Sequence, residues 1–170
     1  MTANLHPTSL PIDALLDQCE VSRTRRSGPG GQHRNKVETA IVIVHKPTGV
    51  RAEASEQRSQ ARNQSVAISR LRLQLAIEVR SEAVREEPSE LWQSRCRGGR
   101  IQVSDQHDEF ATLIAEALDV FVSNELDHKA TAAVLECSVS QLTKLLARST
   151  QVFQSVNQQR AAVGLHRLRT

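Results

Sequence analysis

The stretch Ser27-Gly28-Pro29-Gly30-Gly31-Gln32 decides how this chain is organised. Three glycines and a proline within six residues cannot continue a helix or a strand, so the segment must be an exposed loop. Its glycines can adopt positive φ angles that other residues avoid. Such a loop can bring main-chain N–H groups very close to a ligand. We therefore expect a loop that meets its ligand through the backbone, with the uncharged amide of Gln32 at its tip.

Basic residues flank this loop on both sides. They are Arg23, Arg25, Arg26, Arg34 and Lys36. A cluster of fixed positive charges suits a polyanion better than a small neutral substrate. The sequence thus predicts a loop that reaches along nucleic acid to a reacting group.

The residues around the loop predict a small antiparallel sheet. Residues 19–25 alternate loosely, and residues 40–44 form the β-branched run Ala-Ile-Val-Ile-Val that is typical of a buried strand. Lys46-Pro47-Thr48-Gly49 supplies turn chemistry, and residues 50–54 return as a further strand. We expect an antiparallel hairpin over about 37–55, joined by the strand before the loop.

Helices are expected before and after these strands. Residues 11–18 predict a short helix with Pro11 in its first turn, where the missing N–H costs nothing. Ser55 is a candidate N-cap for a long helix that runs to about Arg85 and lies across the sheet. Its apolar stripe comprises Ala61, Ile68, Leu71, Leu75 and Val79. The predicted fold class is α+β: a small antiparallel sheet with the loop and a long packing helix.

Beyond Pro88, which marks the end of that helical region, the sequence predicts an all-α module. Arg95–Arg100, with its two glycines, is a candidate linker. From Ser104 onward apolar residues recur at helical spacing on one face. They are Phe110, Leu113, Ile114, Ala117, Leu118 and Phe121. We divide the chain into a first domain over 1–92, a linker over 93–104 and a helical module over 105–170.

Residues 130–146 resemble a helix-turn-helix, with Cys137 in the turn where glycine would be more persuasive. The candidate recognition helix offers mainly Gln141, Lys144 and Arg148. The half over 101–170 holds 6 Lys/Arg against 8 Asp/Glu, whereas residues 1–100 hold 16 against 11. A DNA reader needs a basic footprint. We favour a helical bundle that packs on the first domain or docks a partner.

Composition sets the class of protein. The chain has 170 residues and a formal charge of +3, with 39% hydrophobic but 2% aromatic residues, so aliphatic side chains must fill the core. Cys19, Cys96 and Cys137 form no Cys-x-x-Cys pair, which indicates neither a zinc site nor a disulfide framework and fits a reducing cytosol. No targeting signal begins the chain, and no apolar stretch approaches the roughly 20 residues of a membrane span. We expect a soluble, cytoplasmic monomer without metal or cofactor.

The motifs between Arg26 and Leu75 resemble the catalytic GGQ domain of class I peptide-chain release factors and of the small ribosome-rescue peptidyl-tRNA hydrolases. A bare Gly-Gly-Gln would arise by chance in many proteins. Here six linked blocks follow the family's order and spacing, which makes coincidence improbable. The blocks are Ser27–His33, Asn35-Lys36, Glu38-Thr39-Ala40, His45–Gly49, Arg58-Ser59-Gln60 and Asn63.

This resemblance implies hydrolysis of the ester that joins a nascent peptide to the terminal ribose of tRNA, in the peptidyl-transferase centre of the ribosome. Such an ester is already activated, so a positioned water and a stabilised oxyanion suffice. The resemblance assigns the oxyanion or water contact to the Gln32 N–H and the backbone bend to Gly30 and Gly31. It also implies that the 2′-hydroxyl of the substrate carries the proton and that a glutamine methyltransferase modifies Gln32. The expected RNA contacts are Arg25, Arg26, Arg34, Lys36, Arg58 and Arg62.

Four other polar residues have plainer explanations than catalysis. We favour an RNA contact or a local hydrogen bond for His33, because the reaction needs no strong base, and a structural role for His45 at a strand end. Glu53 alternates out of a strand, and Glu56 precedes a helix, where a carboxylate is favoured electrostatically. An acid–base pair of these two carboxylates is therefore not our preferred interpretation.

The length leaves no room for a codon-reading domain, so we favour a codon-independent hydrolase acting on stalled ribosomes. The best-known rescue factors end in a long Lys/Arg-rich tail, whereas residues 157–170 carry three arginines. The helical module could instead bind the ribosome, tRNA or another factor. Two alternatives stay open: a non-catalytic RNA-binding protein of the same fold, and a helix-turn-helix DNA-binding regulator.

Overall fold

The computed structural model describes residues 5–24, 39–81 and 86–170. The chain forms two compact units, one over Pro7–Val79 and one that combines Met1–His6 with Arg80–Thr170. Within the described residues, every helix is too short or too polar to cross a membrane.

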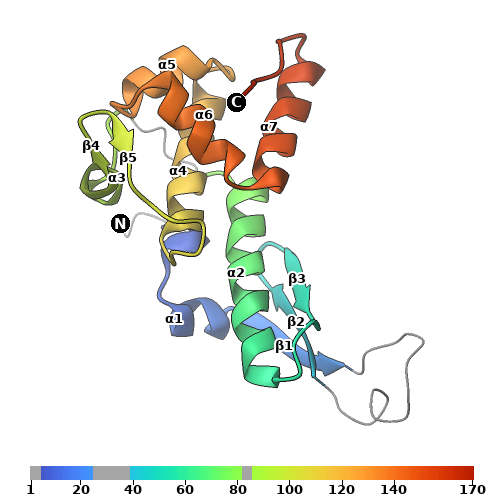
Figure 1. Cartoon of the computed structure of the whole chain (residues 1–170). Helices are drawn as coiled ribbons and strands as arrows, with labels where there is room; N and C mark the ends of the chain where they lie inside the picture. Colours follow the sequence, from blue (N-terminus) through green and yellow to red (C-terminus); the bar gives the residue numbers. More distant parts are fainter. Residues whose placement is uncertain (1–4, 25–38, 82–85) are drawn as a thin grey trace. The chain divides into compact units, whose positions relative to one another are not determined.

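The first unit contains a three-stranded antiparallel sheet in the order β1-β2-β3 (Figure 1). The strands are β1 (Cys19–Thr24), β2 (Ala40–His45) and β3 (Arg51–Ala54). Thr24 at the end of β1 lies opposite Ala40 at the start of β2, and β2 then pairs with β3. The predicted sheet is confirmed, and it begins and ends within a few residues of the expected limits.

The turn between β2 and β3 is held by His45. Gly49 has a φ of +73°, and its N–H donates to the His45 carbonyl over 2.8 Å. The buried His45 ring lies 3.0 Å from Gln18 Oε1 and 2.7 Å from Thr48 Oγ1. Because Gln18 Oε1 can only accept, Nε2 carries the hydrogen and Nδ1 accepts from the Thr48 hydroxyl. Burial also lowers the pKa of His45, which favours this neutral ring. These contacts give His45 the structural role expected of it.

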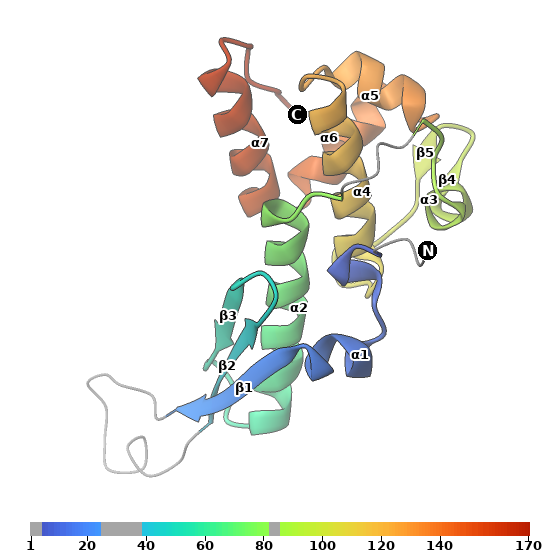
Figure 2. The ribbon, with the colours of Figure 1, turned by 180° about the vertical axis from the view of Figure 1, so that it is seen from behind.

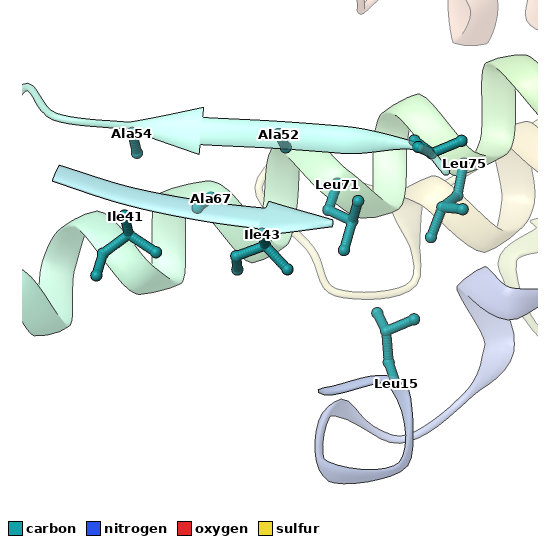
Figure 3. Close-up of a cluster of buried hydrophobic side chains, with 9 residues drawn as sticks. Leu15, Ile41, Ile43, Ala52, Ala54, Ala67, Leu71 and Leu75 are labelled. Carbon is teal, nitrogen blue, oxygen red and sulfur yellow. The ribbon is translucent and has the colours of Figure 1, made fainter. Parts of the chain in front are cut away.

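Helices cover one face of the sheet (Figure 2). A short 3₁₀ turn, η1 (Pro7–Ser9), and α1 (Ile12–Asp17) precede the strands, and α2 (Gln60–Glu78) lies across them. Pro11 directly precedes α1 instead of lying in its first turn. Alternate residues of each strand point to the same side, and α2 meets them with residues four apart. The buried core comprises Leu15, Ile41, Ile43, Val50, Ala52, Ala54, Ala67, Leu71 and Leu75 (Figure 3).

The expected limits of the long helix were wrong. Its N-cap is Ser59, whose Oγ accepts from the Arg62 N–H, and it ends at Glu78, after which Val79 is extended. The stripe is shifted accordingly. Ala61 is exposed, while Leu71 and Leu75 are buried as expected and Ile68 is partly buried against the core. In the segment before Ser59, both polar groups of the Gln57 backbone bond to the Asn63 side chain, as described below.

The second unit is mainly helical, as the α+β prediction with C-terminal helices requires. The face of α4 that was predicted to be apolar, from Phe110 to Phe121, is buried. Helix α4 packs against α5 and α6, and α6 packs against α7. The elements are α3 (Glu90–Arg95), β4 (Cys96–Arg97), β5 (Arg100–Ile101), α4 (Phe110–Ser123), α5 (His128–Val134), α6 (Val139–Ala147) and α7 (Thr150–Ala162).

The segment expected to be a linker contains the β4–β5 hairpin, and an unpredicted helix, α3, precedes it. Both belong to the second unit through specific contacts. The Trp92 indole N–H donates to the Leu135 carbonyl over 2.8 Å, and the buried Glu116 carboxylate accepts from the Ser89 N–H over 2.7 Å. The functional boundaries at 92 and 104 stay a prediction.

Helices α5 and α6 form the helix–turn–helix pair suggested by the sequence. In the turn, Glu136 adopts a φ of +51°. Two of the three candidate base-reading side chains are engaged internally: Gln141 Oε1 accepts from the Ile101 N–H over 3.3 Å, and Arg148 donates to the Val103 carbonyl. These bonds direct the Gln141 oxygen and one Arg148 nitrogen to the protein backbone, so fewer polar groups of this pair are left to present to bases.

Candidate functional site

The sheet fixes both ends of the glycine-rich loop. Because Thr24 and Ala40 are antiparallel partners, the intervening residues connect two neighbouring strands. The proposed catalytic residues and most of the proposed RNA contacts fall between these ends, outside the described residues, and their roles stay predictions. They are Gly30, Gly31, Gln32, Arg25, Arg26, Arg34 and Lys36, together with His33.

The side chain of Asn63 anchors the strand that returns from the loop. Its Nδ2 donates to the Thr39 carbonyl over 2.6 Å and to the Gln57 carbonyl over 3.0 Å. Its Oδ1 accepts from the Gln57 N–H over 2.9 Å. The side chain is fully buried, so these bonds are shielded from water. One amide therefore joins the start of α2, the segment before it and the residue that precedes β2.

Arg58 and Arg62 are the two proposed RNA-contact residues that the structure describes. Both are exposed, and they flank the Ser59 N-cap at the start of α2. The Asn63–Thr39 bond places this end of the helix beside the return of the loop. The structure thus brings Arg58 and Arg62 to the end of the sheet from which the loop extends, and their contact with RNA stays a prediction.

The carboxylates of Glu53 and Glu56 are held in ion pairs. Glu53 lies 2.7 Å from Arg51, and Glu56 lies 2.7 Å from Arg70, whose guanidinium also donates to the Glu53 carbonyl. The hydrogen bond from Arg70 lowers the pKa of the exposed Glu56. A general acid needs a raised pKa, so Glu56 is unsuited to that role. This geometry supports the structural explanation of both residues.

The cysteines and other metal-binding residue types form no candidate metal centre in the part of the chain that the structure describes. Cys19, Cys96 and Cys137 are all free thiols. Burial raises the pKa of Cys19 and Cys96, and it raises the pKa of Cys137 to about 12. These thiols stay protonated at neutral pH and are poor nucleophiles.

Sequence reasoning missed the role of Asn63 as an anchor. Asn63 was recognised only as one block of a motif, and nothing in its spacing showed that its amide would reach Thr39. The sequence offered two equivalent N-caps, because Ser55-x-x-Arg58 and Ser59-x-x-Arg62 have the same pattern, and the structure uses Ser59.

Comparison with known proteins identifies the region that holds this site. Residues 9–111 match the model of the RF-1 domain. The chain is 31% identical over 143 residues, 72% of its length, to peptide chain release factor PrfB1, chloroplastic, of Arabidopsis thaliana. It is 43% identical over 79 residues, 46% of its length, to peptide chain release factor 1 of Xylella fastidiosa. It is 39% identical over 97 residues, 53% of its length, to peptide chain release factor 2 of Staphylococcus saprophyticus.

The matches cover only part of each relative. The chain spans 30%, 19% and 26% of the lengths of these three proteins, respectively. The similarity therefore concerns one region of larger proteins, the region that contains the loop and its scaffold.

Proposed function

The chain belongs to the RF-1 domain family, and on that premise we propose that it hydrolyses the ester bond of peptidyl-tRNA on the ribosome and so releases the nascent peptide. The observation that carries the proposal is the anchored scaffold of the loop. Two paired strands hold its ends, and Asn63 ties the returning strand to α2. The residues to which we assign the chemistry lie between these two anchored ends.

The chemistry needs no strong base from the protein. Attack of water on the ester builds negative charge on the carbonyl oxygen, and a positioned N–H that meets this oxygen lowers the barrier. We assign this contact to the Gln32 N–H and the necessary backbone bend to Gly30 and Gly31. The resemblance to release factors implies that the 2′-hydroxyl of the substrate carries the proton, and we assign no acid–base role to Glu53 and Glu56, which are engaged in ion pairs.

We further propose that release is independent of the codon in the ribosomal A site. The described elements of the first unit form the scaffold of the loop, and we assign recruitment to the helical unit. The proposed partners are the ribosome, peptidyl-tRNA and a glutamine methyltransferase that acts on Gln32. Basic residues beside the loop, Arg58 and Arg62 among them, would contact RNA phosphates.

Release of labelled peptide from ribosomes that carry peptidyl-tRNA tests the proposal. The A site is programmed with a stop codon, a sense codon or no mRNA. Equal rates in all three cases support codon independence, and release confined to the stop codon contradicts it. Ribosome binding without any release would indicate the non-catalytic RNA-binding alternative.

Substitution of the loop isolates the catalytic step. We expect Gln32→Ala, and more strongly Gly31→Ala, to lower the release rate at saturating ribosome concentration by about 10²- to 10³-fold. Both variants keep the Gln32 N–H but change its geometry, and disturbing an oxyanion donor usually costs this much. Gln158→Ala, at an exposed glutamine of α7, is the control. A Gly31→Ala variant with the wild-type rate would overturn the catalytic role of the loop.

A further inference from the structure

The β4–β5 hairpin places two arginines side by side. Gly98 and Gly99 form its turn with φ angles of +56° and +72°, and Arg97 lies directly opposite Arg100. Side chains directly opposite in an antiparallel pair share a face, with Cβ atoms about 4.5–5.5 Å apart. Both arginines are exposed. Like charges in this arrangement repel, so the pair costs stability to the free protein.

The hairpin is a fixed platform for these arginines. The Ile101 N–H donates to Gln141 Oε1 over 3.3 Å, and the Gly99 carbonyl accepts from the Ser138 N–H over 3.2 Å. Ile101 is buried. Because neighbouring residues of a strand point to opposite faces, Arg100 points away from the side on which Ile101 is packed, and Arg97 does so with it. The two guanidinium groups therefore extend from a rigid base into solvent.

Four other arginines of this unit have partners within the protein. Arg80 pairs with Asp119 over 3.0 Å and Arg95 pairs with Glu109 over 2.6 Å, while Arg148 and Arg160 donate to main-chain carbonyls. Arg97 and Arg100 form no ion pair with any residue that the structure describes. Glu136 lines a cavity of about 350 Å³ with Gly98 and Gly99, and it pairs with neither guanidinium. The hairpin thus keeps two positive charges unneutralised.

We propose that the Arg97–Arg100 hairpin is an RNA-binding surface that holds backbone phosphates, separate from the residues around the glycine-rich loop. Guanidinium groups bind phosphate oxygens through paired N–H donors, and two adjacent groups can hold one phosphate or two neighbouring ones. The turn offers no steric obstacle, since a Cβ at Gly98 would meet no atom within 4 Å. A phosphate would relieve the repulsion between the two arginines. This surface would give the helical unit a direct role in recruitment to RNA.

The test compares two double variants that remove the same charge. Arg97→Gln/Arg100→Gln changes the hairpin, and Arg167→Gln/Arg169→Gln changes two exposed arginines near the C-terminus. Binding of each full-length protein to a fluorescent 20-nucleotide poly(U) RNA and to 70S ribosomes is measured between 50 and 200 mM KCl. Loss of two phosphate contacts should reduce the slope of log K against log salt by about 1.4–1.8. The C-terminal control should keep the wild-type slope.

A third variant separates geometry from charge. Arg97→Lys/Arg100→Lys should keep most of the salt slope and bind more weakly, because lysine lacks the planar fork. Circular dichroism and Trp92 fluorescence confirm that each variant is folded. The salt slope is measured from binding alone, so it can change as expected even if the protein releases no peptide. Conversely, the protein can release peptide although the hairpin variants leave the slope unchanged.

Several results would overturn the inference. Equal losses of salt slope in the hairpin and C-terminal variants would show that the arginines act through the overall positive charge and form no specific phosphate-binding site. Displacement of the RNA by millimolar inorganic phosphate would indicate a small-anion site. Binding of phosphatidylglycerol vesicles that depends on the hairpin, with unchanged RNA binding, would indicate a membrane surface. If the Arg97→Gln/Arg100→Gln variant binds poly(U) RNA and 70S ribosomes as the wild type does, the two arginines contact only solvent.

Discussion

At the scale of single residues, the Asn63 side chain uses two donors and one acceptor at once. Its three bonds reach Thr39 and both polar groups of the Gln57 backbone. An aspartate at this position would keep the accepting oxygen but lose the N–H donors, and a leucine would lose the acceptor and the donors. This residue therefore ties Thr39, directly before β2, to the start of α2, in addition to the apolar packing of β2 on the helix.

We expect Asn63→Leu to destabilise the first unit by about 1–3 kcal/mol, since it leaves backbone groups of Gln57 and Thr39 without partners. Hydrogen exchange of peptides from β2 and the start of α2, followed by mass spectrometry, measures the change. Ser65→Ala is the control, because this exposed hydroxyl bonds only to its own helix. Unchanged protection in Asn63→Leu would show that Asn63 is no anchor.

His45 should make the first unit sensitive to acid. Its pKa in the folded protein lies below the ordinary value of 6.5, so the unfolded chain takes up the proton first. Its contribution to stability is complete above about pH 6.5 and declines as the pH falls from there towards the lowered pKa. Protonation would also oppose the Thr48 hydroxyl bond to Nδ1.

Exchange protection of β2 and β3 should therefore fall between pH 7.5 and pH 5.5 after correction for the intrinsic exchange rate. The fall should be smaller in His45→Asn, which has no titrating ring. His166→Asn, at an exposed histidine, should retain the wild-type dependence. The same pH dependence in wild type and His45→Asn would assign the effect to other groups.

At the scale of elements, the sheet and the start of α2 show what the sequence could and could not predict. The residues of the β-branched run of β2 and of the Pro47–Gly49 turn determine their own local conformation, so both elements were predicted. The start of α2 depends on Asn63, whose bonds reach 6 and 24 residues along the chain. Propensity alone cannot choose between Ser55 and Ser59. The β4–β5 hairpin was missed because strands of two residues are too short to show alternation.

The two serines provide a matched pair for the helix start. Ser59→Ala should cost about 0.5–2 kcal/mol, because it removes the side chain that caps the Arg62 N–H. Ser55→Ala, the cap expected from the sequence, should cost markedly less. Thermal unfolding and hydrogen exchange at the first turn of α2 compare them. A larger effect at Ser55 would move the functional start of the helix back to that residue.

At the scale of the whole molecule, the division of the chain after Val79 affects how the helical unit can be removed. The functional boundaries expected from the sequence lie further along, at 92 and 104. A cut at residue 100 would leave the Trp92 indole without the Leu135 carbonyl and Ser89 without Glu116. The candidate site was predicted only in part. The structure confirms the sheet that carries the loop, whereas the roles of Gly30, Gly31 and Gln32 stay predictions.

We expect a fragment over 1–79 to fold and a fragment over 1–100 to carry a disordered extension beyond residue 80. Two-dimensional ¹H–¹⁵N NMR spectra test this expectation. A disordered extension in the 1–100 fragment adds only poorly dispersed peaks to the spectrum of the 1–79 fragment, whereas ordered residues would add dispersed ones. If the helical unit serves recruitment, the 1–79 fragment should release peptide slowly at low ribosome concentration and approach the full-chain rate as concentration rises. A folded fragment that is inactive at saturation would place part of the catalytic machinery beyond Val79. If the 1–79 fragment has the release rate of the full chain at every ribosome concentration, the helical unit does not serve recruitment.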